Sequence, residues 1–79
     1  MTLEQKTLVD AALHRYDAHL TDDNFIAKGP KVMSVRVDVQ KGRLRMLGGT
    51  AVLASYPAAR IEKGVADFVQ KFWFWKPSS

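Results

Sequence analysis

Hydrophobic residues recur at helical spacing near the C-terminal end of the chain. The recurring residues are Ile61, Val65, Phe68, Phe72 and Trp75. Their intervals of four and three residues place them on one face of a helix, which the pattern predicts from Pro57 to Trp75. Gly64 lies inside this helix at a cost of about 1 kcal/mol relative to alanine, so we expect its backbone to approach the sheet or the first helix closely.

The first twenty residues have the pattern of a second amphipathic helix. Thr2 and Gln5 stand at capping-box spacing, in which each side chain accepts a hydrogen bond from the other residue's backbone N–H. The apolar positions on one side of this helix are Val9, Ala12, Leu13, Tyr16 and Leu20. We therefore predict a helix that opens at Thr2 and runs to His19 or Leu20.

The pattern changes from helical to alternating after residue 30. Short polar side chains at residues 21–24 favour a turn, and we expect Phe25 and Ile26 to tuck under the core. Beyond the break at residues 28–30, apolar residues alternate with polar ones at Met33, Val35, Val37 and Val39. Such alternation is typical of a strand with one buried face.

Two tight turns predict that this strand opens a three-stranded antiparallel meander. With residues 41–42 as the first loop, Val37 lies opposite Met46, Asp38 opposite Arg45 and Val39 opposite Leu44. With Gly48 and Gly49 as the second loop, the pairs are Leu44 with Leu53 and Met46 with Ala51. The third strand is expected to end near Tyr56, before the proline.

The element order α-β-β-β-α predicts a single α+β domain over residues 1–79. Apolar stripes on both helices and one apolar sheet face indicate two layers, with the three-stranded meander on one side and both helices packed on its apolar face. Residues 76–79 are expected to fray.

Composition narrows the class of protein. The 79 residues include no cysteine, which excludes disulfides and thiolate metal sites. Neither an export signal nor a long apolar run is present, so we expect a cytoplasmic protein that does not enter membranes. Residues 1–27 carry two basic and five acidic side chains, and residues 28–79 carry ten basic and three acidic ones. This asymmetry favours an anionic partner, or pairing of one copy's acidic helix with another copy's basic sheet.

The exposed face of the predicted sheet is the first candidate binding surface. Its basic and aromatic residues are Arg36, Arg43, Arg45, Lys31, Lys41 and Tyr56. Guanidinium groups form planar, charge-assisted hydrogen bonds and stack on rings, which suits phosphate contact and protein interfaces alike. A solvated face that arginine keeps soluble is the third interpretation.

The aromatic run at residues 72–75 is the second candidate surface. Four consecutive aromatic residues cannot share one helix face, so Trp73 and Phe74 are expected to point away from the apolar stripe. We expect these side chains to pack against one of four surfaces: the first helix, the loop around Phe25, a second copy of the chain or a foreign protein.

No residue pattern indicates an enzyme or a metal centre. Asp10 and His14 share a helix face, but a metal site needs at least a third ligand. No serine lies at a recognisable spacing from the histidines, and residues 48–50 precede a strand instead of the helix N-terminus that binds phosphate. We therefore predict a non-enzymatic protein without metal or cofactor.

The element order, with Gly29 and Pro30 ahead of the strand at residues 35–39, resembles the double-stranded RNA-binding domain. That family has a lysine-rich cluster at the start of its last helix, where residues 57–63 here offer only Arg60 and Lys63, and its histidine after the Gly-Pro is missing. The resemblance implies the topology only, and no RNA-binding residue is carried over.

These observations predict a small interaction protein that binds a protein partner, with homodimerisation as a way to enlarge its core. We picture an inhibitor or adaptor of the kind that phages and other mobile elements encode, acting on a host complex that handles nucleic acid. The alternative is a nucleic-acid-binding module that contacts phosphates through the basic hairpin face, at Arg36, Arg43, Arg45, Lys31 and Lys41.

Overall fold

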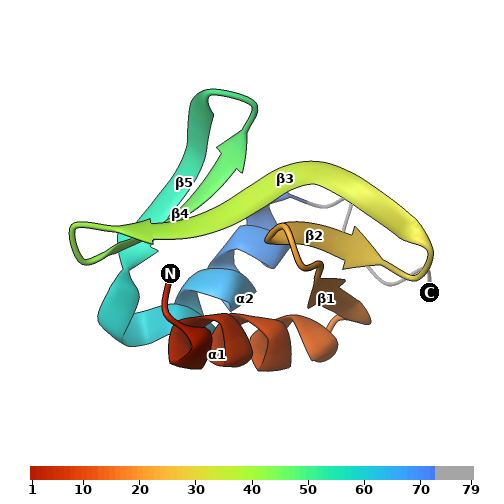
Figure 1. The fold of residues 1–79 in the computed structure, drawn as a ribbon, viewed down its shortest axis with the longest axis horizontal. Helices are drawn as coiled ribbons and strands as arrows, with labels where there is room; N and C mark the ends of the chain where they lie inside the picture. The colour runs from red at the N-terminus through yellow and green to blue at the C-terminus, as the bar shows by residue number, and fades with distance from the viewer. Residues whose placement is uncertain (73–79) are drawn as a thin grey trace.

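Five antiparallel strands and two α-helices make up residues 1–72, the part of the chain that the computed structural model describes (Figure 1). The elements in chain order are α1 (Leu3–His14), β1 (Ala18–Leu20), β2 (Phe25–Lys28), β3 (Lys31–Gln40), β4 (Arg43–Gly48), β5 (Ala51–Pro57), the 3-10 helix η1 (Ala58–Arg60) and α2 (Ile61–Lys71). One sheet holds all strands in the order β1-β2-β3-β4-β5. The predicted α+β class is confirmed, but the sheet has five strands instead of the predicted three; β3, β4 and β5 form the predicted meander, and β1 and β2 are the additional strands. The predictions for Trp73, Phe74, Trp75 and residues 76–79 lie outside the described residues.

A capping box begins α1, as predicted. Thr2 Oγ1 accepts a hydrogen bond from the Gln5 backbone N–H at 3.1 Å, and Gln5 Oε1 accepts one from the Thr2 backbone N–H at 2.9 Å. The first N–H groups of a helix have no partner inside it, so these two bonds stabilise the helix start.

The strand β1 occupies residues that the sequence assigns to the end of the first helix. α1 ends at His14, and the chain turns at Asp17, whose φ of 59° lies in the left-handed region. The backbone N–H of Leu20 donates to Asp10 Oδ1 at 2.8 Å, and β1 pairs with β2. A helix that continues to residue 19 or 20 is therefore the wrong prediction, because these residues gain partners in the sheet instead.

The strand β2 contains Phe25 and Ile26, which the sequence places in a loop under the core. It pairs with β1 on one side and with β3 on the other. Gly29 and Pro30 separate the paired residues Lys28 and Lys31, so the predicted break is a two-residue hairpin turn. The periodicity of the sequence misses β1 and β2 because strands of three and four residues are too short to show a period of two.

The hairpin of β3 and β4 has the predicted register. Lys41 and Gly42 form its loop with φ values of 51° and 73°, the positive values that a type I′ turn requires. The confirmed pairs are Val37 with Met46, Asp38 with Arg45 and Val39 with Leu44.

The register of β4 and β5 differs from the prediction through a shifted turn and a bulge. Gly48 pairs with Ala51, so Gly49 and Thr50 form the loop. Leu53 is then an extra residue, after which Met46 pairs with Ala54 and Leu44 with Tyr56. Because side chains alternate along a strand, one extra residue reverses the faces of the rest of β5. The placement of Tyr56 on the exposed face is therefore wrong: it lies on the face toward the helices.

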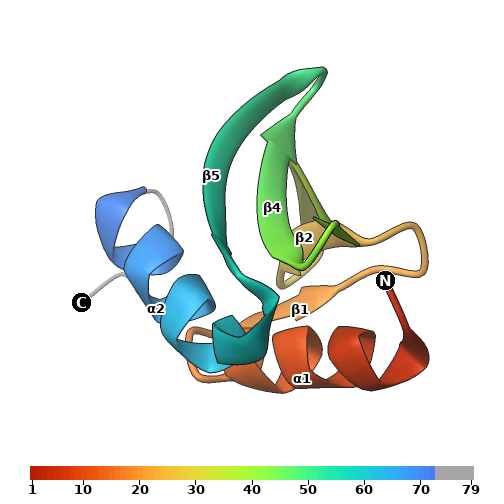
Figure 2. The ribbon, with the colours of Figure 1, turned by 90° about the vertical axis from the view of Figure 1, so that its left-hand side faces the viewer.

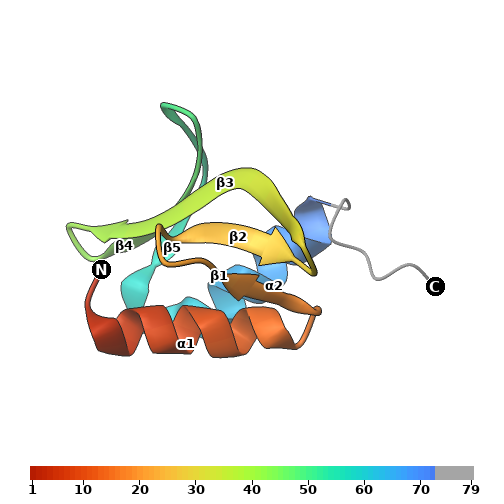
Figure 3. The same cartoon turned by 45° about the vertical axis from the view of Figure 1, so that its right-hand side comes forward.

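One apolar core joins both helices to the sheet. Its fully buried large side chains are Val9, Leu13, Ile26, Val37, Leu44, Met46, Val65 and Phe68. The predicted stripe of α2 is confirmed within the described residues, since Ile61, Val65 and Phe68 are buried and Phe72 packs against the core. α1 packs against β1, α2 packs against β5, and the helices contact each other, instead of both covering a three-stranded sheet (Figure 2). The hairpin of β4 and β5 extends away from the helices (Figure 3).

Candidate protein interface

The face of the sheet that points away from the core carries a row of side chains across four strands. Directly paired residues of an antiparallel sheet project to the same face. Phe25 pairs with Arg36, Arg36 with Leu47, and Leu47 with Val52. We call this surface the outer sheet face, and it comprises Phe25, Val32, Arg36, Asp38, Arg43, Arg45, Leu47, Val52 and Ser55.

Leu47 forms the buried centre of this face. Its side chain is only 5% exposed, although it does not belong to the core between sheet and helices. Val52, its neighbour on β5, is 49% exposed, and Val32 is 57% exposed. Leu47 is covered within the chain itself, so Val32 and Val52 are the apolar residues of this face that remain exposed for a partner to cover.

Two of the three arginines on the outer sheet face already have partners. Arg45 binds Asp38 through two hydrogen bonds, from Nε to Oδ1 at 2.9 Å and from Nη2 to Oδ2 at 2.8 Å. The hydrogen bond from Arg45 lowers the pKa of Asp38, so this carboxylate stays ionised at a lower pH than an ordinary aspartate does. Arg43 donates from Nε to Ser55 Oγ at 3.1 Å. The outer sheet face therefore holds an ion pair without net charge.

The other predicted cations are exposed but separate. Arg36 lies in the middle of β3, whereas Lys31 begins this strand and Lys41 follows its last residue. At a rise of about 3.3 Å per residue, the two lysines lie on the order of 30 Å apart along the strand. The structure thus places Arg36, Arg43 and Arg45 on the outer sheet face but separates Lys31 from Lys41.

Tyr56 belongs to a polar contact between β5 and α2. Its hydroxyl donates to Asp67 Oδ2 at 2.8 Å, and the same oxygen lies 3.3 Å from Lys71 Nζ. Burial and then the hydrogen bond to Asp67 raise the pKa of Tyr56 to about 12. Tyr56 therefore joins α2 to the sheet.

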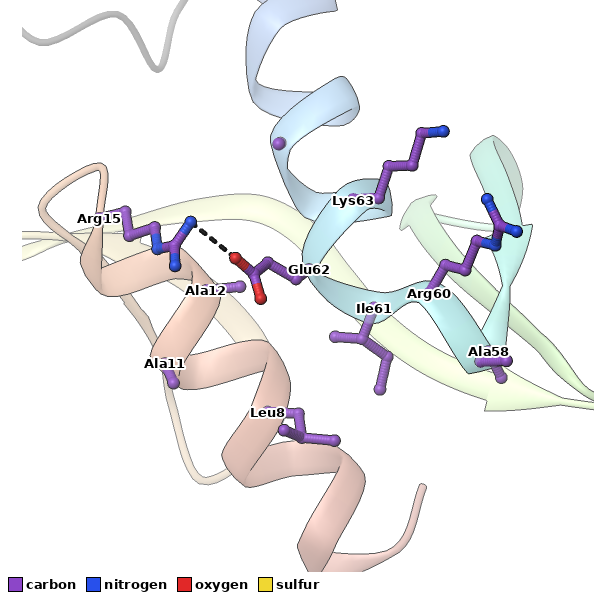
Figure 4. A pocket seen from close by; sticks show the side chains of 11 residues that line it. Leu8, Ala11, Ala12, Arg15, Ala58, Arg60, Ile61, Glu62 and Lys63 are labelled. Carbon is purple, nitrogen blue, oxygen red and sulfur yellow. Dashed lines mark ion pairs between the residues drawn. The ribbon is translucent and has the colours of Figure 1, made fainter.

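A groove that sequence reasoning missed lies between α1 and the segment formed by η1 and α2 (Figure 4). It encloses about 630 Å³, and its walls include Leu8, Ala11, Ala12, Ala58 and Ile61. Arg15 of α1 pairs with Glu62 of α2 at 2.7 Å across it. In the sequence, the feature that could have indicated this groove is Leu8, an apolar residue at the edge of the apolar stripe of α1. Leu8 is 51% exposed in the structure.

The histidine and carboxylate side chains of the described residues do not cluster. Within residues 1–72, no three His, Cys, Asp or Glu side chains lie together as metal ligands would. His14 Nε2 lies 3.8 Å from Asp10 Oδ2, while Asp10 Oδ1 already accepts the N–H of Leu20.

No helix within residues 1–72 is long and apolar enough to cross a membrane.

Comparisons with known proteins find no match among family models, curated proteins or solved structures. The sheet also differs from the three-stranded arrangement that the resemblance to the double-stranded RNA-binding domain implies, because β1 and β2 extend it to five strands. Function is therefore inferred from the surfaces described above.

Proposed function

We propose that this chain is a small non-enzymatic protein that binds another protein through the outer sheet face, as an inhibitor or adaptor. The observation that carries the proposal is the row of Phe25, Arg36, Leu47 and Val52 across four strands. A partner would cover the exposed side of Val52 and place a carboxylate against Arg36. Protein interfaces favour exposed apolar side chains beside arginine, because a guanidinium both packs on apolar groups and forms paired hydrogen bonds.

The charges of the outer sheet face favour a protein over a nucleic acid. Affinity for a phosphate backbone rises with the number of cations that contact it. Arg45 is already bound to Asp38, whose negative charge repels phosphate, and the two lysines lie at opposite ends of β3. Direct nucleic-acid binding through Arg36 and Arg43 is the competing function that an experiment must separate.

Binding measurements at two salt concentrations distinguish protein binding from nucleic-acid binding. The purified chain is titrated with labelled duplex DNA, duplex RNA and single strands at about 50 mM and then about 200 mM salt. We expect no binding, or binding weaker than the affinity of about 10⁻⁶ M that ordinary nonspecific contacts reach. Tight binding at low salt that falls by orders of magnitude at the higher salt would establish the competing function instead.

Partner capture then tests the surface. The tagged chain is used to isolate a partner from the native host, and Val52→Glu and Arg36→Glu are compared with the parent chain. Both substitutions should abolish capture, because one places an unpaired charge in the interface and the other reverses the charge that the partner reads. Leu3→Glu is the matched control, since Leu3 is an exposed apolar residue on α1.

The aromatic run is tested in the same experiment with Trp73→Ala. Capture that survives Val52→Glu and Arg36→Glu but fails with Trp73→Ala would transfer the site from the outer sheet face to the C-terminal aromatic residues. Capture that survives all three substitutions would contradict both surfaces.

A further inference from the structure

One stripe of α1 is exposed and complements itself when its direction is reversed. Glu4, Leu8, Ala11 and Arg15 follow one another at intervals of four, three and four residues, and all four are exposed. This spacing places them along a single line of the helix surface. If a second α1 lies antiparallel against this line, glutamate meets arginine and leucine meets alanine.

The stripe borders the groove between α1 and α2. Leu8, Ala11 and Arg15 line the groove on the α1 side, and Ala58 lines it from η1 (Figure 4). Ala59 and Ala66 also line the groove. The small alanine side chains leave a volume of about 630 Å³ between the apolar residues and the charged rim of Arg60, Glu62 and Lys63, which can accept larger side chains from another molecule. Half of the Leu8 side chain is exposed to solvent next to this space.

We infer that two copies of this chain form a dimer in which their α1 helices pack antiparallel about a two-fold axis. Leu8 of each copy then enters the groove of the other and packs on Ala11 and the alanines beyond it. The same patch serves both copies, as an isologous interface requires. This surface is distinct from the outer sheet face, so the dimer does not depend on the proposed function.

Charge complementarity identifies the occupant as a second copy. Glu4 has no ion-pair partner among residues 1–72. In the antiparallel pair the Glu4 carboxylate meets the partner's Arg15. Arg15 already pairs with Glu62 of its own copy at 2.7 Å, but a guanidinium has five N–H donors and can bind both carboxylates. Parallel helices would place like charges together, so the charges also fix the direction.

The size of the stripe sets the expected affinity. α1 has twelve residues and is therefore about 18 Å long. A pair of such helices with their neighbouring groove walls makes a small interface, and small interfaces are typical of weak, transient complexes. We expect a monomer–dimer equilibrium with a dissociation constant of about 10 micromolar.

Sedimentation equilibrium of the full chain over a concentration series tests the dimer. The parent chain should change from monomer to dimer, whereas Leu8→Glu should dimerise about 100-fold more weakly, because each dimer contains this residue twice. Val32→Glu is the control, since Val32 is exposed to a similar extent but lies on the outer sheet face. It should leave the equilibrium unchanged.

Charge reversal gives a sharper test. Glu4→Lys and Arg15→Glu should each weaken self-association by about tenfold, because like charges then face each other in the homodimer. Mixed together, the two variants should form a heterodimer, since the lysine of one faces the glutamate of the other. Circular dichroism of each variant checks that the fold is intact. A parent chain that remains monomeric at about 500 micromolar, or a dimer that neither Leu8→Glu nor the charge variants weaken, would overturn the inference.

Discussion

The ring of Tyr56 in β5 lies directly against the backbone of Gly64 in α2. A Cβ built on Gly64 would stand 2.9 Å from Tyr56 Cγ and 3.0 Å from Tyr56 Cβ. Carbon atoms that are not bonded pack at about 3.5–4.0 Å, so only glycine allows α2 to approach the strand this closely. The expectation that Gly64 marks a close backbone approach is confirmed, and its neighbour is the sheet.

Gly64→Ala should therefore destabilise the protein although alanine is the better helix former. Alanine gains roughly 1 kcal/mol of helix propensity. Forcing a methyl group against the part of Tyr56 nearest the backbone should reverse this gain and leave a net loss of about 1–2 kcal/mol in the free energy of unfolding. Urea denaturation measures the difference.

A double-mutant cycle provides the control for Gly64. A Tyr56→Ala background removes the ring but keeps the Cβ that would stand 3.0 Å from the added methyl group, so the same Gly64→Ala substitution should cost less stability there than in the parent chain. An increase in stability from Gly64→Ala alone would show that the contact with Tyr56 does not limit the position of α2.

The phenol of Tyr56 should ionise only in strong alkali. Burial and the hydrogen bond to Asp67 raise its pKa to about 12. Tyr16→Phe leaves Tyr56 as the only tyrosine, so the ultraviolet absorbance of tyrosinate reports this group alone. Asp67→Asn should lower the pKa because it removes the negative charge that disfavours phenolate. A midpoint near pH 10 in the folded protein would contradict the structural assignment.

The same group should make stability depend on pH in the alkaline range. The pKa of Tyr56 is higher in the folded state, so its contribution is fully present below about pH 10 and is lost as the pH rises toward about 12. In this window the unfolded chain releases the proton and the folded chain keeps it. The stability difference between the parent chain and Tyr56→Phe should therefore shrink as the pH rises, which urea denaturation at several pH values measures.

Asp10 should hold β1 in place. Its Oδ1 accepts the backbone N–H of Leu20 at 2.8 Å, the contact that draws residues after α1 into the sheet. Asp10→Ala leaves this N–H without its acceptor and should lower stability by about 1–2 kcal/mol. Hydrogen exchange of the Leu20 amide should accelerate in the same variant.

Asp10→Asn tests whether the hydrogen bond or the charge of Asp10 stabilises β1. Asp10→Asn keeps a carbonyl oxygen where the carboxylate accepted the bond, so it should retain most of the stability and protect the Leu20 amide. Equal loss in both variants would show that the charge of Asp10 matters and not the hydrogen bond.

The ion pair of Asp38 and Arg45 should stabilise the fold at neutral pH but not in strong acid. The hydrogen bond from Arg45 lowers the pKa of Asp38 in the folded state. The contribution is therefore present above the ordinary pKa of an aspartate and is lost as the pH falls through the lower folded value. Asp38→Asn should be less stable than the parent chain at neutral pH, and this difference should disappear in acid. A difference that stays constant with pH would contradict the assignment.

The candidate surfaces were predictable only in part. The register of β3 and β4 placed Arg36 and Leu47 on one face and Asp38 opposite Arg45, all from alternation and a two-residue turn. The extra residue at Leu53, which turns Tyr56 away from that face, leaves no periodic signal. The bulge turns Tyr56 toward Gly64 of α2. This contact joins two segments, so the alternation of residues within one strand does not encode it.

The sequence by itself determined the elements whose signals are local. The capping box at Thr2, the loop at Lys41 and Gly42 and the apolar stripe of α2 each depend on residues a few positions apart, so their physical causes can be read along the chain. Tertiary structure decided the rest. β1 is three residues long and exists because Asp10 and β2 supply its hydrogen-bond partners, and the outer sheet face acquires its ends only when β2 and β5 join the sheet. Both depend on contacts between segments that are distant in sequence, whose free energy appears only when the whole sheet has formed.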